Sequence, residues 1–238
     1  MSLDPRRLEW VPLNLHPRLA FMGMTLFSMN FLVFYHATEH IASGVVSVIF
    51  AGAALFIALF EFLLFRKPPS VRIVIGGAAG IIGLGVLFSG SIAGNQVLQP
   101  QGLALAVIGT CLFSMGNIVS SRLPDGVHFP SAVAIAMVYG ALFSAGVALA
   151  GGKDFSLPAS AVYFGGLVYL SLIASVVGFL AYLTLVKQDG PSRAGYITVL
   201  FPLIALSVSA TTGEYAWSLL SAVGIGFVFF GTAIVFAR

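Results

Sequence analysis

Long apolar runs constrain this chain more than any other feature of its sequence. A helix that crosses a membrane needs about 20 mostly apolar residues, whereas a strand of a membrane barrel needs only about 9–11 residues of alternating polarity. The runs are about 17–28 residues long and therefore predict helices. The predicted spans cover residues 19–37, 41–65, 73–89, 102–121, 131–150, 159–186, 194–212 and 217–237.

Composition supports an integral membrane protein. Hydrophobic residues make up 59% of the 238 residues and charged residues only 8%, against about 25% charged in a soluble domain. The 27 glycines suit helices that pack closely in a membrane. The single cysteine, Cys111, excludes a disulfide framework and a cysteine-based metal cluster. We therefore expect an all-α, polytopic transmembrane bundle of about eight spans.

Basic residues fall almost entirely on one side of these spans. If the spans alternate in direction, only Lys153 among the eleven lysines and arginines lies on the other side. Loops rich in Lys and Arg stay in the cytoplasm, so both termini are expected there, with the chain in the cytoplasmic (inner) membrane. The net charge of +3 is spread over single residues and small groups. This spread does not form the basic patch of a nucleic-acid-binding protein, so the expected partners are lipid and a small molecule.

Two stretches of the chain resemble each other at a spacing of about 148 residues. The turn before the second span faces outside, and the matching turn before the seventh faces inside, so the copies are inverted. Inverted repeats are typical of secondary transporters, whose substrate site lies near the midplane between the halves. The matched pairs are Phe34 with Tyr182, Ser43 with Ser192 after a slip of one residue, Gly76 with Gly224, and Gly83 with Gly231.

Short motifs near the helix ends resemble those of the EamA-type transporters of the drug/metabolite transporter superfamily. NFLVFYHA at 30–37, followed by IASGVV at 41–46, resembles the family pattern FYxAL…tSAG. GPSRA at 190–194, LFP at 200–202 and GE at 213–214 resemble G-x-S-R-A…P…GE. The chain departs from the pattern at Gly52 or Ala53, where a mid-helix proline is expected, and at Arg66, where a glutamate is expected.

The resemblance implies an inverted repeat of five plus five helices. The chain matches the last three helices of the first repeat and all five of the second, so two N-terminal helices are expected to be missing. The expected divisions are a cytoplasmic segment at 1–18, a partial first repeat at 19–90 and a second repeat at 102–238.

The function expected from the resemblance is secondary transport, most simply export, of small metabolites such as amino acids or related compounds by alternating access. The alternative is a non-transporting or incomplete membrane protein, or a partner subunit of the same family. The sequence contains no phosphate loop, HExxH, Gly-x-Ser-x-Gly or metal-ligand spacing, so we expect neither an enzyme nor a cofactor. Dimerisation through the glycine-rich faces is left open.

Polar residues inside the apolar runs are the candidate substrate contacts, because polar groups in a membrane are costly. Asn30, near the middle of the first span, either bonds another helix or faces a substrate cavity. Tyr35 and His36 end that span, as part of an interfacial belt or of an outer gate. The same two interpretations, packing inside the bundle or lining of a substrate cavity, apply to the other candidates, which are Asn117, Ser175, Tyr182 and Tyr196.

Two further residues are candidates for coupling or gating. Glu61 is the one carboxylate inside an apolar run, about 12 Å from the middle of its helix. It either pairs with Arg66 or Lys67 at the cytoplasmic edge or binds a proton or substrate. Pro202, at the middle of the seventh span, either kinks the helix for gating or is simply tolerated there.

Overall fold

The computed structural model describes residues 10–41, 43–93, 99–152, 160–200, 202–203 and 219–236. Over these residues the chain forms helices and no strand, which confirms the expected all-α class. The first half contains α1 (His16–Met24), the π-helical segment η2 (Thr25–Met29), α2 (Asn30–Thr38), α3 (Ser43–Ala51), α4 (Ala53–Phe65) and α5 (Val71–Ala93). The second half contains α6 (Pro100–Ser121), α7 (Phe129–Ala150), α8 (Ala161–Tyr169), the π-helical segment η3 (Leu170–Gly178), α9 (Phe179–Asp189), α10 (Pro191–Gly195), the 3₁₀ turn η4 (Tyr196–Val199) and α12 (Leu219–Phe236).

Four continuous helices are long and apolar enough to cross a membrane, namely Leu13–Thr38, Pro100–Ser121, Phe129–Ala150 and Ala161–Asp189. The helices Val45–Ala51 and Ala53–Phe65 are bent by 41° at their junction, and the two together are long and apolar enough to count as a fifth span. Shorter apolar helices cover Val71–Val86 and Ala222–Val235. Most of the predicted seventh span, 194–212, lies outside the described residues, and the total of eight spans stays a prediction.

Helix boundaries follow local backbone chemistry. The bend between α3 and α4 falls at Gly52, the position where the resemblance led us to expect a proline, because glycine also weakens a helix locally. α4 ends at Phe65, because the next residue, Arg66, adopts a left-handed conformation with φ of 56°. Pro100 begins α6. Proline has no backbone N–H, and because the N–H groups of the first helical turn have no partner within the helix, no hydrogen bond is lost at this position.

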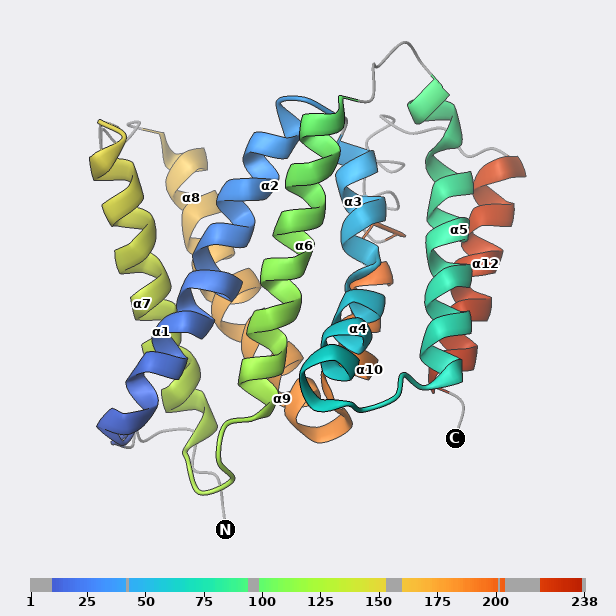
Figure 1. Cartoon of the computed structure of the whole chain (residues 1–238). Coiled ribbons are helices and arrows are strands. Elements are labelled where there is room, and N and C mark those ends of the chain that lie inside the picture. The colour runs from blue at the N-terminus through green and yellow to red at the C-terminus, as the bar shows by residue number, and fades with distance from the viewer. Residues whose placement is uncertain are drawn as a thin grey trace.

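The helices form one bundle of roughly antiparallel segments (Figure 1). At the end drawn lowest, α1, α5 and α7 begin and α4, α6, α9 and α12 end. We call this the basic end, because every described lysine or arginine lies in the helix turns and connectors there. They are Arg18, Arg66, Lys67, Arg72, Arg122, Lys187 and Arg193.

The matched glycines of the two repeats pack directly on each other. α5 and α12 run antiparallel at one side of the bundle (Figure 1). A methyl group added to Gly76 would lie 2.7 Å from the Gly231 carbonyl oxygen, and one added to Gly83 would lie 2.6 Å from that of Gly224. Gly76 matches Gly224 and Gly83 matches Gly231, so exchanging matched residues turns the contact of Gly76 with Gly231 into that of Gly224 with Gly83. A two-fold axis between inverted repeats has this effect.

Other contacts lie along the same axis. Thr198 donates a long hydrogen bond of 3.5 Å to the carbonyl oxygen of Phe50, which precedes it by 148 residues. The π-helical segments η2 and η3 also match at this spacing, because residues 25–29 correspond to 173–177. π-helices are rare and often lie at functional sites, so their paired occurrence supports the repeat independently of the glycines.

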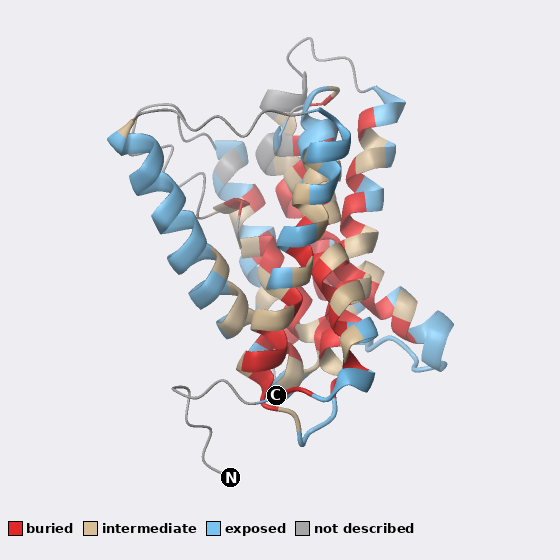
Figure 2. Cartoon of the chain, turned by 90° about the vertical axis from the view of Figure 1, so that its left-hand side faces the viewer, coloured by how far each residue is buried: buried red, intermediate tan, exposed pale blue. Residues whose placement is uncertain are grey.

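Burial differs strongly between the matched first and sixth spans. Leu19, Met22 and Leu26 in the first span are fully buried, whereas no residue of α8 or η3 is. In Figure 2, the helix that begins with α8 and η3 leans away from the bundle, and its upper part is exposed. The basic end of the bundle is therefore closely packed, while the opposite end is looser on the side of α8.

Candidate functional site

Asn30 lies at the centre of the bundle, facing α6. One turn before it, Leu26 packs against Gly116, and one turn after it, Phe34 packs against Gly109. These two contacts place Asn30 opposite the stretch of α6 that contains Phe113. The Asn30 residue is only 1% exposed, which confirms that its amide faces other parts of the protein.

Asn117 and Tyr182 complete a cluster at this level. Asn117 lies one turn beyond Phe113 on α6, is fully buried, and donates from Nδ2 to the Phe113 carbonyl oxygen at 2.8 Å. The Tyr182 ring on α9 stacks on the Phe113 ring, with centroids 5.8 Å apart. Its hydroxyl lies near Asn117, but no hydrogen bond of ordinary length joins the two side chains. We call Asn30, Asn117 and Tyr182 the central cluster.

Each member of the central cluster has an oxygen without a hydrogen-bond partner. These atoms are Asn30 Oδ1, Asn117 Oδ1 and Tyr182 Oη, all buried and unpaired within the described part of the chain. Buried polar atoms are normally satisfied, and leaving one unpaired costs about 1–3 kcal/mol. Three such atoms from three helices favour a site whose natural occupant is a ligand.

Aromatic rings surround the central cluster. Phe50 contacts both Phe34 and Phe113 edge to face, with centroids 5.2 and 4.9 Å away. Phe179, one turn before Tyr182, contacts Phe27 at 4.9 Å. The rings come from both halves of the chain, so a ligand here would lie at the junction of the two repeats.

A second group of polar residues ties the halves together at the basic end. Glu61 Oε1 accepts from Lys67 Nζ at 3.0 Å, and Oε2 accepts from Ser192 Oγ at 2.5 Å. The Glu61 side chain is 8% exposed and that of Lys67 is 61% exposed. The predicted ion pair is therefore confirmed, with Lys67 as its partner. We call Glu61, Lys67 and Ser192 the basic-end latch.

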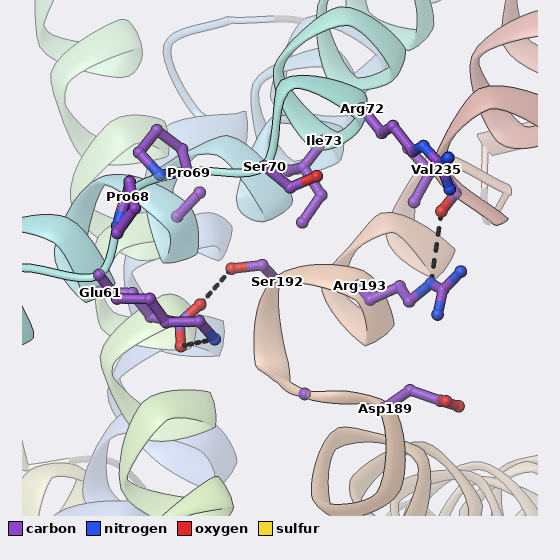
Figure 3. Close-up of a pocket in the computed structure, with 13 residues that line it drawn as sticks. Glu61, Pro68, Pro69, Ser70, Arg72, Ile73, Asp189, Ser192, Arg193 and Val235 are labelled. Atoms are coloured by element: carbon purple, nitrogen blue, oxygen red, sulfur yellow. Dashed lines mark hydrogen bonds and ion pairs between the residues drawn. The ribbon is translucent and has the colours of Figure 1, made fainter. Parts of the chain in front are cut away.

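A cavity of about 340 Å³ adjoins the latch. Figure 3 shows Glu61 pointing across it to Ser192, with Arg193 and Asp189 on the far wall. Arg193 Nε donates to the Val235 carbonyl oxygen at 3.3 Å, so this arginine also holds α12. The latch thus closes the bundle where α4 of the first half meets α10 of the second.

Several predicted site residues lie away from both groups. Tyr35 is 68% exposed near the opposite end of the bundle, and His36 Nδ1 lies 2.8 Å from the Leu32 carbonyl oxygen of its own helix. Ser175 lies in η3, where its hydroxyl donates to Leu170 O at 2.9 Å. None of these three contacts the central cluster, and their substrate roles stay predictions.

Tyr196 and Pro202 both belong to the predicted seventh span. Tyr196 is fully buried, and its hydroxyl donates to the Gly76 carbonyl oxygen at 2.9 Å, which ties η4 to α5. Pro202 is buried, but residues 201 and 204–218 lie outside the described part, so the predicted kink is untested.

Sequence reasoning missed two kinds of residue. Ser192 was predicted only as a repeat match, because its partner Glu61 is 131 residues away. Phe113 and Phe50 looked like ordinary core residues, and only their rings around the central cluster distinguish them. The nearest signal was the turn at Gly190-Pro191, with φ of 88° at Gly190, which begins α10 just before Ser192.

The fold resembles that of a protein of known crystal structure. The superposition covers 99% of this chain and 78% of the other, with a TM-score of 0.71 at 18% identity. The likeness shows a shared architecture.

Sequence relatives are named as transporters. The chain is 26% identical over 217 residues to the uncharacterized inner membrane transporter YedA of Escherichia coli K12, covering 91% of this chain and 69% of that protein. It is 23% identical to an uncharacterized transporter of Archaeoglobus fulgidus, covering 97% and 80%, and 22% identical to protein PecM of Dickeya dadantii, covering 92% and 73%. The EamA-like transporter family model matches residues 2–89 and 100–237. The chain is therefore an integral membrane protein that belongs to the EamA-like transporter family.

Proposed function

We propose that this chain is a secondary transporter that exports small metabolites, such as amino acids or related compounds, across the cytoplasmic membrane by alternating access. Family membership and relatives named as transporters support transport in general. The central cluster carries the proposal for this chain: three buried, unpaired oxygens lie where helices of both halves meet. A secondary transporter binds its substrate in such a place.

Both termini lie in the cytoplasm in this proposal. The described lysines and arginines gather at one end of the bundle, which fits the preference of positive loops for the cytoplasm. α1 begins and α12 ends at this same end (Figure 1). The basic-end latch then closes the cytoplasmic side, and Glu61 is its gating residue.

Transport also requires that the latch can open. The Glu61 carboxylate holds Ser192 of the other half directly, so protonation of Glu61 or entry of a substrate into the adjoining cavity would weaken that contact. Glu61 is therefore proposed to couple a proton or the substrate to opening of the cytoplasmic side.

Counterflow in proteoliposomes tests this function. Vesicles containing the purified protein are preloaded with unlabelled metabolite, and uptake of the labelled metabolite is followed for a panel of amino acids and amines. We expect uptake that the double variant Asn30→Leu/Asn117→Leu loses. Thr184→Val is the matched control, because Thr184 is an exposed α9 residue whose hydroxyl bonds its own helix at Leu180. Absence of uptake for every metabolite, with correctly folded protein in the vesicles, would contradict the proposal.

The second candidate is a partner subunit that does not transport alone. The exposed faces of α8 and η3 favour it, because the matched first span packs against α6 and α7. A cysteine introduced by Val168→Cys in a Cys111→Ala background tests this idea, since Val168 is 56% exposed. Crosslinking to another protein in native membranes would favour the subunit. Complete labelling by a lipid-soluble maleimide would favour the independent transporter.

A further inference from the structure

One unpaired oxygen of the central cluster is fixed as an acceptor by a hydrogen bond from its own amide group. Asn117 donates from Nδ2 to the Phe113 carbonyl oxygen at 2.8 Å, and this bond determines which end of its amide is the oxygen. Its Oδ1 is consequently left to accept from elsewhere. Asn30 also has its Oδ1 unpaired. An amide oxygen accepts hydrogen bonds and cannot donate them.

The third unpaired atom is Tyr182 Oη, which both accepts and donates. The cluster therefore offers three oxygens that can accept hydrogen bonds, two of them amide oxygens. A primary ammonium group carries three N–H donors and no acceptor. The number and type of the unpaired atoms match such a group.

The surroundings of the cluster favour a cation and oppose an anion. The rings of Phe34, Phe50, Phe113 and Phe179 lie near the cluster, and aromatic rings attract an ammonium group. No lysine or arginine of the described chain lies at this level, since all of them lie at the basic end. A carboxylate placed here would face two amide oxygens, which cannot donate to it, whereas an ammonium group would donate hydrogen bonds to the same oxygens.

Among the described residues, the nearest buried carboxylate is separate from the cluster. Ser114, beside Phe113 on α6, lies 3.5 Å from the Ala53 carbonyl oxygen at the start of α4. Glu61 lies eight residues further along α4, about 12 Å toward the basic end. Its two oxygens are already bonded to Lys67 and Ser192. The amine is therefore held by neutral oxygens and rings.

On the basis of the transport function proposed above, we propose that the central cluster binds the amino group of an amphipathic amine. Asn30 Oδ1, Asn117 Oδ1 and Tyr182 Oη accept from the amino group, and the apolar or aromatic body packs among the phenylalanine rings. The cluster is closed to solvent in this conformation. Entry requires movement of α9, which carries Tyr182 and continues into the exposed segment η3.

Three probes of nearly identical shape test the inference in detergent-purified protein at neutral pH. They are 2-phenylethylamine, 2-phenylethanol and 3-phenylpropionate, which differ in the charged or polar group and share the ring. Binding is measured by titration calorimetry. We expect the amine to bind at least about tenfold more tightly than the carboxylate, since a tenfold change is about 1.4 kcal/mol and one hydrogen bond to a charge is worth about that.

Variants connect the binding to the named atoms. Asn30→Leu, Asn117→Leu and Tyr182→Phe should each weaken amine binding by about tenfold, and Thr184→Val should leave it unchanged. Asn30→Leu and Asn117→Leu should also raise the unfolding temperature of the empty protein, because each removes an unpaired buried oxygen. A purely structural role predicts the reverse, a lower unfolding temperature. Tyr182→Phe removes only a hydroxyl and so provides a test that does not depend on tolerance of leucine.

Two results would overturn the amine assignment: equal binding of amine and carboxylate, or amine binding that all three variants leave unchanged. Counterflow separates this failure from failure of transport. If a substrate without an amino group is transported and the amine is not preferred in binding, the transport function is supported and the amine assignment is wrong. If the amine binds but no substrate is transported, the amine assignment is supported and the transport function is wrong.

Discussion

At the scale of single residues, the basic-end latch concentrates two unequal contacts on Glu61. The Ser192 hydroxyl is buried with the carboxylate, whereas the Lys67 side chain is 61% exposed. Exposed ion pairs contribute about 0–1 kcal/mol, while a buried hydrogen bond to a charged group contributes about 1.5–3 kcal/mol. The bond to Ser192 is therefore the stronger of the two.

We expect Ser192→Ala to lower the free energy of unfolding by about 1–3 kcal/mol and Lys67→Ala by less than about 1 kcal/mol. Unfolding in mixed micelles with increasing SDS measures both. In the double variant Glu61→Ala/Ser192→Ala, the loss should be smaller than the sum of the single losses, because the two residues share one bond. An effect of Lys67→Ala equal to or above that of Ser192→Ala would contradict the geometry.

Local spacing decided which residue contacts the sequence could predict. The pairing of Glu61 with Lys67 was predictable, because the two are six residues apart at a helix end. The burial of Asn30 and Asn117 was also predictable from the cost of polar groups in a membrane. Their proximity to each other and to Tyr182 was not, because it depends on how α2, α6 and α9 pack. Tyr35 fits the same helical motif as Asn30, yet it is largely exposed.

At the scale of elements, the seam between α5 and α12 depends on glycine. Methyl groups on Gly76 or Gly83 would meet carbonyl oxygens of α12 within 2.7 Å, whereas one on Gly85 of the same helix meets nothing within 4 Å. Gly76→Ala and Gly83→Ala should each destabilise the protein by about 1–3 kcal/mol through overpacking. Gly85→Ala should be neutral or stabilising, since alanine favours a helix. The measurement is thermal unfolding followed by loss of helical circular dichroism.

Equal tolerance of alanine at positions 76, 83 and 85 would show that the two helices do not pack as described. Gly226 on α12 provides a second control, because its position is also open.

The elements were predictable to different degrees. Apolar length predicts where helices lie, because a membrane leaves few alternatives for an uncharged run. It does not predict the 41° bend at Gly52 or the π-helical segments η2 and η3, which depend on backbone hydrogen bonding within the folded bundle. The exposure of α8 was equally out of reach, because its sequence is as apolar as that of the buried helices.

At the scale of the whole molecule, the proposed transporter consists of two inverted halves that meet at the central cluster and are joined at the basic end. The contacts between matched residues, such as Thr198 with Phe50, lie along the axis that relates the halves. If the halves rock about this axis, opening one end must close the other. The loose packing at the opposite end and the closed latch at the basic end fit one extreme of that motion.

The most direct test of alternating access measures the accessibility of both ends in one experiment. Ala58→Cys lines the cavity at the basic end, where Ala58 is 4% exposed, and Tyr35→Cys lies near the opposite end, where Tyr35 is 68% exposed. Each cysteine is placed in a Cys111→Ala background and labelled with a water-soluble maleimide, with and without Glu61→Ala. We expect loss of the latch to speed labelling at position 58 and to slow it at position 35. Labelling rates that change in the same direction at both positions, or at position 58 alone, would contradict the account.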